Sequence, residues 1–229
     1  MNHRKIATLA VAALVLVACG KGSGARGTGK ITVSNIEKDG RNHTIVLNGV
    51  ITIRNVQIKS GRNGQFLAFP QRKGQGDRSF NYVKVERDDA AFLLEQVKNE
   101  EIAATPTGFE ITAVKIKLLT GPGKKKAFVE FELNGVLKLY SWGIIIGDKG
   151  PFLVPPSERV GDDWQDVVFA SREFREQLQA AALAELILRY LPQYYFFSAE
   201  LQLFPPEVAR LAENLVEGYE VAADLEGEY

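Results

Sequence analysis

Few side chains in this sequence could carry acid–base, nucleophilic or metal chemistry. The 229 residues include two histidines, His3 and His43, and one cysteine, Cys19. A tetrahedral zinc site needs three or four such ligands, and a serine or cysteine nucleophile needs a base beside it. His43 stands in a predicted loop between Asn42 and Thr44, where we expect a solvated side chain. The sequence therefore predicts no catalytic residues, no bound metal and no cofactor.

Three other patterns resemble chemical sites but are better explained by local structure. Asp88-Asp89 and Asp162-Asp163 are adjacent carboxylates, whereas glycoside hydrolysis needs two carboxylates that face one bond. We expect Asp88 or Asp89 to cap a helix instead. Residues 121–126 contain Gly-Lys but lack the other glycine and the serine or threonine of a phosphate-binding loop, so they predict a basic hairpin tip. An enzyme is the weakest functional hypothesis.

The N-terminal residues have the layout of a bacterial lipoprotein signal. A cationic head, residues 1–5, precedes an uncharged apolar run over residues 6–17, which ends in Leu16-Val17-Ala18-Cys19. The apolar run covers about 18 Å as a helix, too short for the roughly 30 Å hydrocarbon layer of a bilayer. Leu-Val-Ala-Cys resembles the lipobox, whose cysteine receives a diacylglyceryl group. We predict a signal peptide over residues 1–18, lipid attachment at Cys19, and a cell-envelope protein facing the periplasm or the exterior.

Charge is distributed unevenly along a chain whose net charge is zero. Residues 20–80 hold 11 basic and 3 acidic side chains, whereas residues 190–229 hold 1 basic and 8 acidic ones. Clustered lysines and arginines bind phosphates, and interleaved rings stack on bases. The candidate residues for binding nucleic acid or a protein partner are Arg72, Lys73, Arg78, Gly64, Phe66 and Arg159. The alternative, which we favour, is that Phe66, Phe69 and Phe80 fill a core beneath a solvated charged face.

The chain contains two similar segments. Leu47-Asn48-Gly49-Val50-Ile51 recurs 86 positions later as Leu133-Asn134-Gly135-Val136-Leu137. Residues 61–70 match residues 147–156 at the same offset. A duplication is the simplest explanation.

Each copy has the same predicted order of elements. The first strand begins at Ile31-Thr32 in one copy and at the matching Ile111-Thr112 in the other. Each Asn-Gly pair between β-rich runs predicts a type I′ hairpin, because both residues tolerate positive φ. One last strand follows over residues 80–85 or 164–169, and then one helix, over residues 88–101 or 171–191. This order predicts an α+β protein of two units, each a mostly antiparallel sheet packed against one helix.

This order of elements, with its Gly-x-x-Gly-x-Phe loop, resembles the stage V sporulation protein G (SpoVG) family of small bacterial septation regulators. Residues 63–73, with the sequence NGQFLAFPQRK, carry the sharpest likeness. The resemblance implies a domain that dimerises through its sheet, a role in septation and sporulation control, and nucleic-acid binding in several members. Two copies in one chain would form an intramolecular pseudo-dimer. The second copy departs from the pattern at Glu158, which replaces a basic residue.

The remaining segments complete the predicted organisation. After the signal, residues 19–30 form a Gly-rich flexible tether. The repeats occupy residues 31–103 and 110–191, and residues 192–229 form an acidic helical extension behind Pro192, which interrupts an aromatic run. We expect the extension to pack onto the body; the alternative is a docking patch for a partner.

These observations predict a lipid-anchored, non-enzymatic binding or regulatory protein of the cell envelope. Its expected partners are the membrane, through Cys19, and another protein. The septation and sporulation theme comes from the family resemblance alone. The alternative function is a nucleic-acid-binding regulator that uses Arg72, Lys73 and Arg78, which requires a cytoplasmic location.

Overall fold

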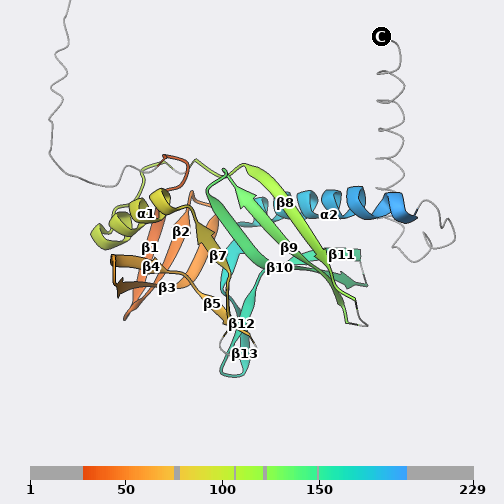
Figure 1. Cartoon of the computed structure of the whole chain (residues 1–229), viewed down its shortest axis with the longest axis horizontal. Coiled ribbons are helices and arrows are strands. Elements are labelled where there is room, and N and C mark those ends of the chain that lie inside the picture. Colours follow the sequence, from red (N-terminus) through yellow and green to blue (C-terminus); the bar gives the residue numbers. More distant parts are fainter. Residues whose placement is uncertain (1–27, 75–77, 106, 121–122, 149, 195–229) are drawn as a thin grey trace, which may run out of the picture.

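The structure is a computed structural model that describes residues 28–74, 78–105, 107–120, 123–148 and 150–194 (Figure 1). The predicted signal peptide, Cys19, most of the tether and nearly all of the acidic extension lie outside the described residues. Within the described part, no helix combines the length and apolar character that crossing a membrane requires.

The first sheet is antiparallel and has five strands. Its order is β1-β2-β3-β14, with β4 also paired to the long strand β3. The strands are β1 (Val33–Asp39), β2 (Asn42–Leu47), β3 (Ile51–Gly61), β4 (Gly64–Ala68) and β14 (Val168–Ala170). Helix α1 (Arg87–Asn99) contacts β1 and β4.

The second sheet has the same construction. Its order is β11-β10-β9-β8, with β7 also paired to the long strand β10. The strands are β7 (Val83–Val85), β8 (Ile111–Leu118), β9 (Lys125–Leu133), β10 (Leu137–Gly147) and β11 (Gly150–Val154). Helix α2 (Arg172–Tyr194) contacts β8 and β11 and also β14 of the first sheet. The predicted α+β class, with mostly antiparallel sheets and one helix each, is confirmed.

Two short hairpins lie outside the sheets. They are β5 (Gln71–Lys73) with β6 (Ser79–Asn81), and β12 (Ser157–Val160) with β13 (Asp163–Asp166). The second hairpin projects away from both sheets in Figure 1. The prediction of one last strand before each helix is wrong. Residues 80–85 are divided between the hairpin strand β6 and the sheet strand β7, and residues 164–169 are divided between the hairpin strand β13 and the sheet strand β14.

The two halves exchange their last sheet strands. Strand β7 belongs to the first half of the chain but pairs with β10, and β14 belongs to the second half but pairs with β3. Val83 lies opposite Leu139, and Val168 lies opposite Ile53. Because Ile53 and Leu139 are 86 positions apart, the two exchanges occupy matching positions.

The predicted type I′ turns are confirmed by their backbone angles. Asn48 and Gly49 have φ values of 48° and 77°, and Asn134 and Gly135 have 51° and 69°. The asparagine side chains also bind the preceding chain. Asn48 Oδ1 accepts from the Thr32 amide and Asn134 Oδ1 from the Glu110 amide, each at 2.7 Å. These bonds hold the chain that enters the first strand of each half.

A second pair of hydrogen bonds corrects the alignment of the first strands. Ser34 Oγ accepts from the Gly49 amide at 2.8 Å, and Thr112 Oγ1 accepts from the Gly135 amide at 3.2 Å. Ser34 therefore holds the position of Thr112. The match of Ile31-Thr32 with Ile111-Thr112 is wrong by two residues, because similar residue types recur along alternating strands.

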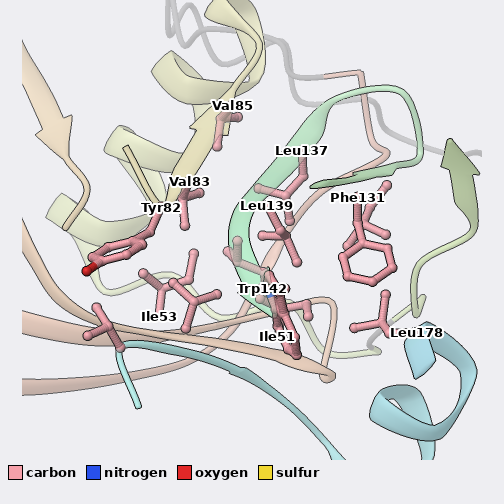
Figure 2. Close-up of a cluster of buried hydrophobic side chains, with 14 of the residues drawn as sticks. Ile51, Ile53, Tyr82, Val83, Val85, Phe131, Leu137, Leu139, Trp142 and Leu178 are labelled. Atoms are coloured by element: carbon pink, nitrogen blue, oxygen red, sulfur yellow. The ribbon is translucent and has the colours of Figure 1, made fainter. Parts of the chain in front are cut away.

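One hydrophobic core joins the two sheets. Side chains from both sheets and from α1 and α2 form a single buried cluster. Figure 2 shows part of it, with Tyr82 and Val83 near Ile53, and Phe131 and Leu178 from the second half. The exchanged strands thus supply apolar side chains to an interior that both halves share.

Three local expectations are wrong. Helix α1 has Glu86 as its N-cap residue, without a side-chain cap bond; Asp89 instead accepts from the Thr28 amide at 2.9 Å and hydroxyl at 2.8 Å. His43 is not in a solvated loop but inside β2, with 8% of its surface exposed. The alternation of strand residues turns it inward together with Ile45.

Helix α2 also continues beyond the predicted end at residue 191, through Pro192 to Tyr194.

Candidate functional site

A cleft of about 630 Å³ lies between the β5–β6 hairpin and the solvent-facing side of the second sheet. Both halves of the chain contribute to it, and its volume is typical of ligand-binding sites. Its cations are Arg72, Lys84, Lys115 and Lys117, and its rings are Phe80, Phe128 and Tyr140. It therefore combines positive charge with aromatic surface.

Strand alternation explains why these side chains share one face. On β8, Ile116 is buried, with 7% of its surface exposed, and its neighbours Lys115 and Lys117 are exposed. On β9, Phe128 and Glu130 flank the buried Val129. Successive residues of a strand point to opposite faces, so one set packs in the core and the other lines the cleft.

The cleft holds more cations than anions. Among the residues that the structure describes, Glu130 is the only acidic one that lines the cleft, and its carboxylate lies 3.9 Å from Lys115 Nζ. Arg72, Lys84 and Lys117 form no ion pair within the described ranges. The site is therefore suited to an anion, which would replace counterions there.

Aromatic rings lie against glycines and cations at the hairpins. The Arg72 guanidinium carbon is 5.4 Å from the centre of the Phe80 ring. A Cβ atom on Gly74 would approach Phe80 Cε2 to 2.5 Å, so only glycine leaves room for this ring. Phe66 lies over Gly61 in the same way, where a Cβ would be 3.2 Å from Phe66 Cε1.

The expectation that the three phenylalanines fill a core is wrong for two of them. Phe66 and Phe80 are each 47% exposed, whereas Phe69 packs against the core. The neighbouring Leu67 takes the inward position on β4, which places Phe66 on the opposite side. Exposed rings beside cations are available to a ligand.

The structure brings only some of the predicted binding residues together. Arg72, Lys73 and Arg78 lie on or beside the β5–β6 hairpin, but only Arg72 lines the cleft. Gly64 and Phe66 belong to the separate β3–β4 hairpin. Arg159 lies on β12, where its Nε donates to the Gly161 carbonyl at 3.1 Å.

Sequence reasoning missed the lysines of the second half. Lys115 and Lys117 alternate with Ile116, a pattern that predicts a charged strand face, and this pattern was the available signal. Lys84 comes from β7, whose position depends on the strand exchange. A cleft built by two halves is not visible as one cluster in the sequence.

The matching face of the first sheet has the opposite charge at two positions. Lys115 lies opposite Glu130, and Glu37 lies opposite Thr44, which is 86 positions before Glu130. Glu37 therefore occupies the place of Lys115. By the same register Asp39 occupies the place of Lys117. The lysine pair is therefore a feature of the second sheet, whereas the first sheet has a cation–aromatic contact of its own, with the Arg54 guanidinium carbon 4.8 Å from the centre of the Phe169 ring.

Tyr82 lies where the hairpin meets β7. Burial, the charge of Glu158 and a hydrogen bond to that carboxylate together raise its pKa to about 12, while Arg72 opposes the change. The buried phenol thus keeps its proton and connects the two hairpins through Glu158.

The raised pKa predicts an alkaline loss of stability. The folded protein favours neutral Tyr82, so its contribution is complete below pH 10 and is lost as the pH rises from 10 to about 12. We expect the free energy of unfolding to fall by about 2 kcal/mol more in the wild type than in Tyr82→Phe over this interval. Urea unfolding at pH 8, 10 and 11.5 measures the difference. Parallel pH profiles for the two proteins would contradict the assignment.

No group of three or more histidine, cysteine, aspartate or glutamate side chains in the described segments is arranged to hold a metal ion.

Comparison with known proteins identifies the family. No profile of a protein family matches the chain. It is 38% identical over 76 residues to a SpoVG protein of Symbiobacterium thermophilum, covering 32% of this chain and 54% of that relative. It is 32% identical over 78 residues to one of Clostridium acetobutylicum, covering 33% and 82%. A third, of Lachnoclostridium phytofermentans, is 29% identical over 84 residues, covering 36% and 90%.

The extent of the match differs among these relatives. The aligned segment spans about half the length of the Symbiobacterium protein but more than four-fifths of the Clostridium protein. Each relative carries the name SpoVG with a provisional assignment to septation. At 32% identity over most of a complete relative, and with the expected sheet-and-helix construction, the chain belongs to the SpoVG family.

Proposed function

We propose that this chain is a non-enzymatic binding protein, held at the cell envelope by a lipid on Cys19, whose cleft on the second sheet receives an anionic partner. The observation that carries the proposal is the composition of the cleft, in which Arg72, Lys84 and Lys117 have no ion pair among the described residues. Cations and rings hold a ligand by charge and stacking, which is sufficient for a binding protein.

The proposed setting is septation. The names of the relatives support this theme, and the lipobox-like Leu16-Val17-Ala18-Cys19 supports an envelope location. A tether over residues 19–30 would separate the folded body from the membrane and leave the cleft open to an envelope protein.

Fractionation of cells that express the full chain tests the anchor. We expect the wild type to incorporate a lipid label and to fractionate with the envelope. The Cys19→Ala variant should remain unlabelled, because the thiol that accepts the lipid is absent. An unlabelled, full-length wild type in the cytoplasm would contradict the proposal.

The β5–β6 hairpin favours a second candidate, binding of single-stranded nucleic acid. Its Arg72 guanidinium lies over Phe80, and Lys73 and Arg78 are exposed beside them. Such a surface can pair with phosphates and stack on bases.

Binding of a labelled 20-nucleotide single strand tests this candidate. The affinity should fall steeply with salt, and the triple change Arg72→Gln, Lys73→Gln, Arg78→Gln should weaken it at least about tenfold. Lys59→Gln with Arg62→Gln, on the β3–β4 hairpin, is the matched control. Binding that ignores salt, or equal losses in both variants, would contradict a specific role of the β5–β6 hairpin.

A further inference from the structure

The cleft on the second sheet carries positive charge that the described residues do not balance. Three of its four cations lack a carboxylate within 4.0 Å among the described residues, where Glu130 is paired with Lys115. The nearby Lys125 has a lowered pKa, mainly because of burial and also because of Arg72. These cations repel one another, so an anion placed in the cleft would relieve an unfavourable interaction.

The same chain supplies a block of negative charge. Residues 195–229 contain eight acidic side chains and one basic side chain, Arg210. Because the whole chain is neutral, the other residues carry the opposite excess. The acidic residues are Glu200, Glu207, Glu213, Glu217, Glu220, Asp224, Glu226 and Glu228.

This acidic segment also has rings and sufficient length. It contains Phe196, Phe197 and Phe204, which could pack against the exposed Phe80. It follows α2, whose 23 residues span roughly 34 Å at a helical rise. Residues 195–229 could extend over roughly 110 Å, more than enough to pass from the end of α2 around the sheet to the cleft.

We propose that the acidic segment, residues 195–229, docks in the cleft of its own chain and competes there with external anions. The inference rests on the proposed anion-binding role of the cleft. Attachment to α2 gives the segment an effective concentration of about 1 mM, so even weak pairing with Lys84 and Lys117 would keep the cleft occupied. Only a ligand that binds more strongly, or is locally concentrated, would displace it.

Carbodiimide cross-linking of a chain comprising residues 20–229, followed by mass spectrometry, tests the docking without any ligand. We expect amide links from Lys84, Lys115 or Lys117 to acidic residues of the segment, several-fold more frequent than links from Lys59, which is exposed on β3. The links should fall sharply at about 1 M salt, where screening is nearly complete. Links that form equally with Lys59, or none to the cleft, would overturn the proposal.

A mixture of isotopically light and heavy chains identifies the occupant. Links within one chain support docking of the segment in the cleft of its own chain. Predominant light-to-heavy links would show that a second copy occupies the cleft, and would overturn the proposal.

Inorganic polyphosphate as a probe separates this inference from the proposed function. Changing Glu207, Glu213, Glu217 and Glu220 to glutamine should strengthen polyphosphate binding about tenfold if the segment competes. Unchanged binding would refute competition and leave the cleft as an anion site. If neither protein binds polyphosphate, the cleft is not an anion site. If polyphosphate still binds after Lys84→Glu with Lys117→Glu, the anion binds elsewhere, which also refutes the cleft as the site.

Discussion

Replacement of Trp142 by alanine should lower the free energy of unfolding by about 3–5 kcal/mol. Its side chain is fully buried in β10, and its ring meets that of Phe131 edge-on, with centres 5.9 Å apart. Truncation would leave a large cavity at the centre of the shared core. Small domains are stable by only about 5–15 kcal/mol, so the variant should be close to unfolding.

The other tryptophan provides a matched control. Trp164 on β13 is 71% exposed, so Trp164→Ala should change stability by less than about 0.5 kcal/mol. Urea unfolding followed by circular dichroism measures both variants. The variant Trp142→Phe separates the effect of lost packing from the effect of the polar Nε1 atom. Nε1 of Trp142 has no hydrogen-bond partner among the described residues. Similar losses for Trp142→Ala and Trp164→Ala would contradict the described core.

Separation of the two halves should abolish the folded monomer. We propose that the halves form an intramolecular pseudo-dimer, supported by the reciprocal pairing of β7 with β10 and of β14 with β3. A fragment of residues 28–105 lacks the partner of β7 and leaves Ile51 and Ile53 without β14. We expect each half alone to be unfolded or to form an exchanged dimer, and the two halves to assemble one to one when mixed.

Light scattering with circular dichroism measures this outcome. The control is the full chain cleaved between Ala104 and Thr105, where no helix or strand is interrupted, and it should keep its fold. A folded, monomeric fragment of residues 28–105 would show that the exchange is dispensable.

Local features of the fold were predictable because they depend on a few adjacent residues. The two Asn-Gly turns require positive φ at both positions, which few other residues tolerate, so the sequence locates them. The helices were predicted within about three residues of their ends, because their polar starts and apolar spacing are local.

Features that depend on distant pairing were not predictable in this way. The division of residues 80–85 into β6 and β7 follows from a partner strand more than 50 positions away. The outward direction of Phe66 and Phe80 depends on strand phase, and a shift of one residue reverses it. The cleft depends on both, so Arg72 was identified and Lys84, Lys115 and Lys117 were not.

The contrast between Lys115 and Lys117 on one sheet and Glu37 and Asp39 on the other has an evolutionary consequence. In a symmetric homodimer every substitution appears on both faces, so a change that improves one site alters its twin as well. Once two copies are fused, each face accumulates substitutions independently. A molecule of this kind has two unlike faces. If the second sheet binds the anion that we propose, such a molecule would take one ligand where a symmetric pair would take two, and would present it in one direction relative to the proposed tether.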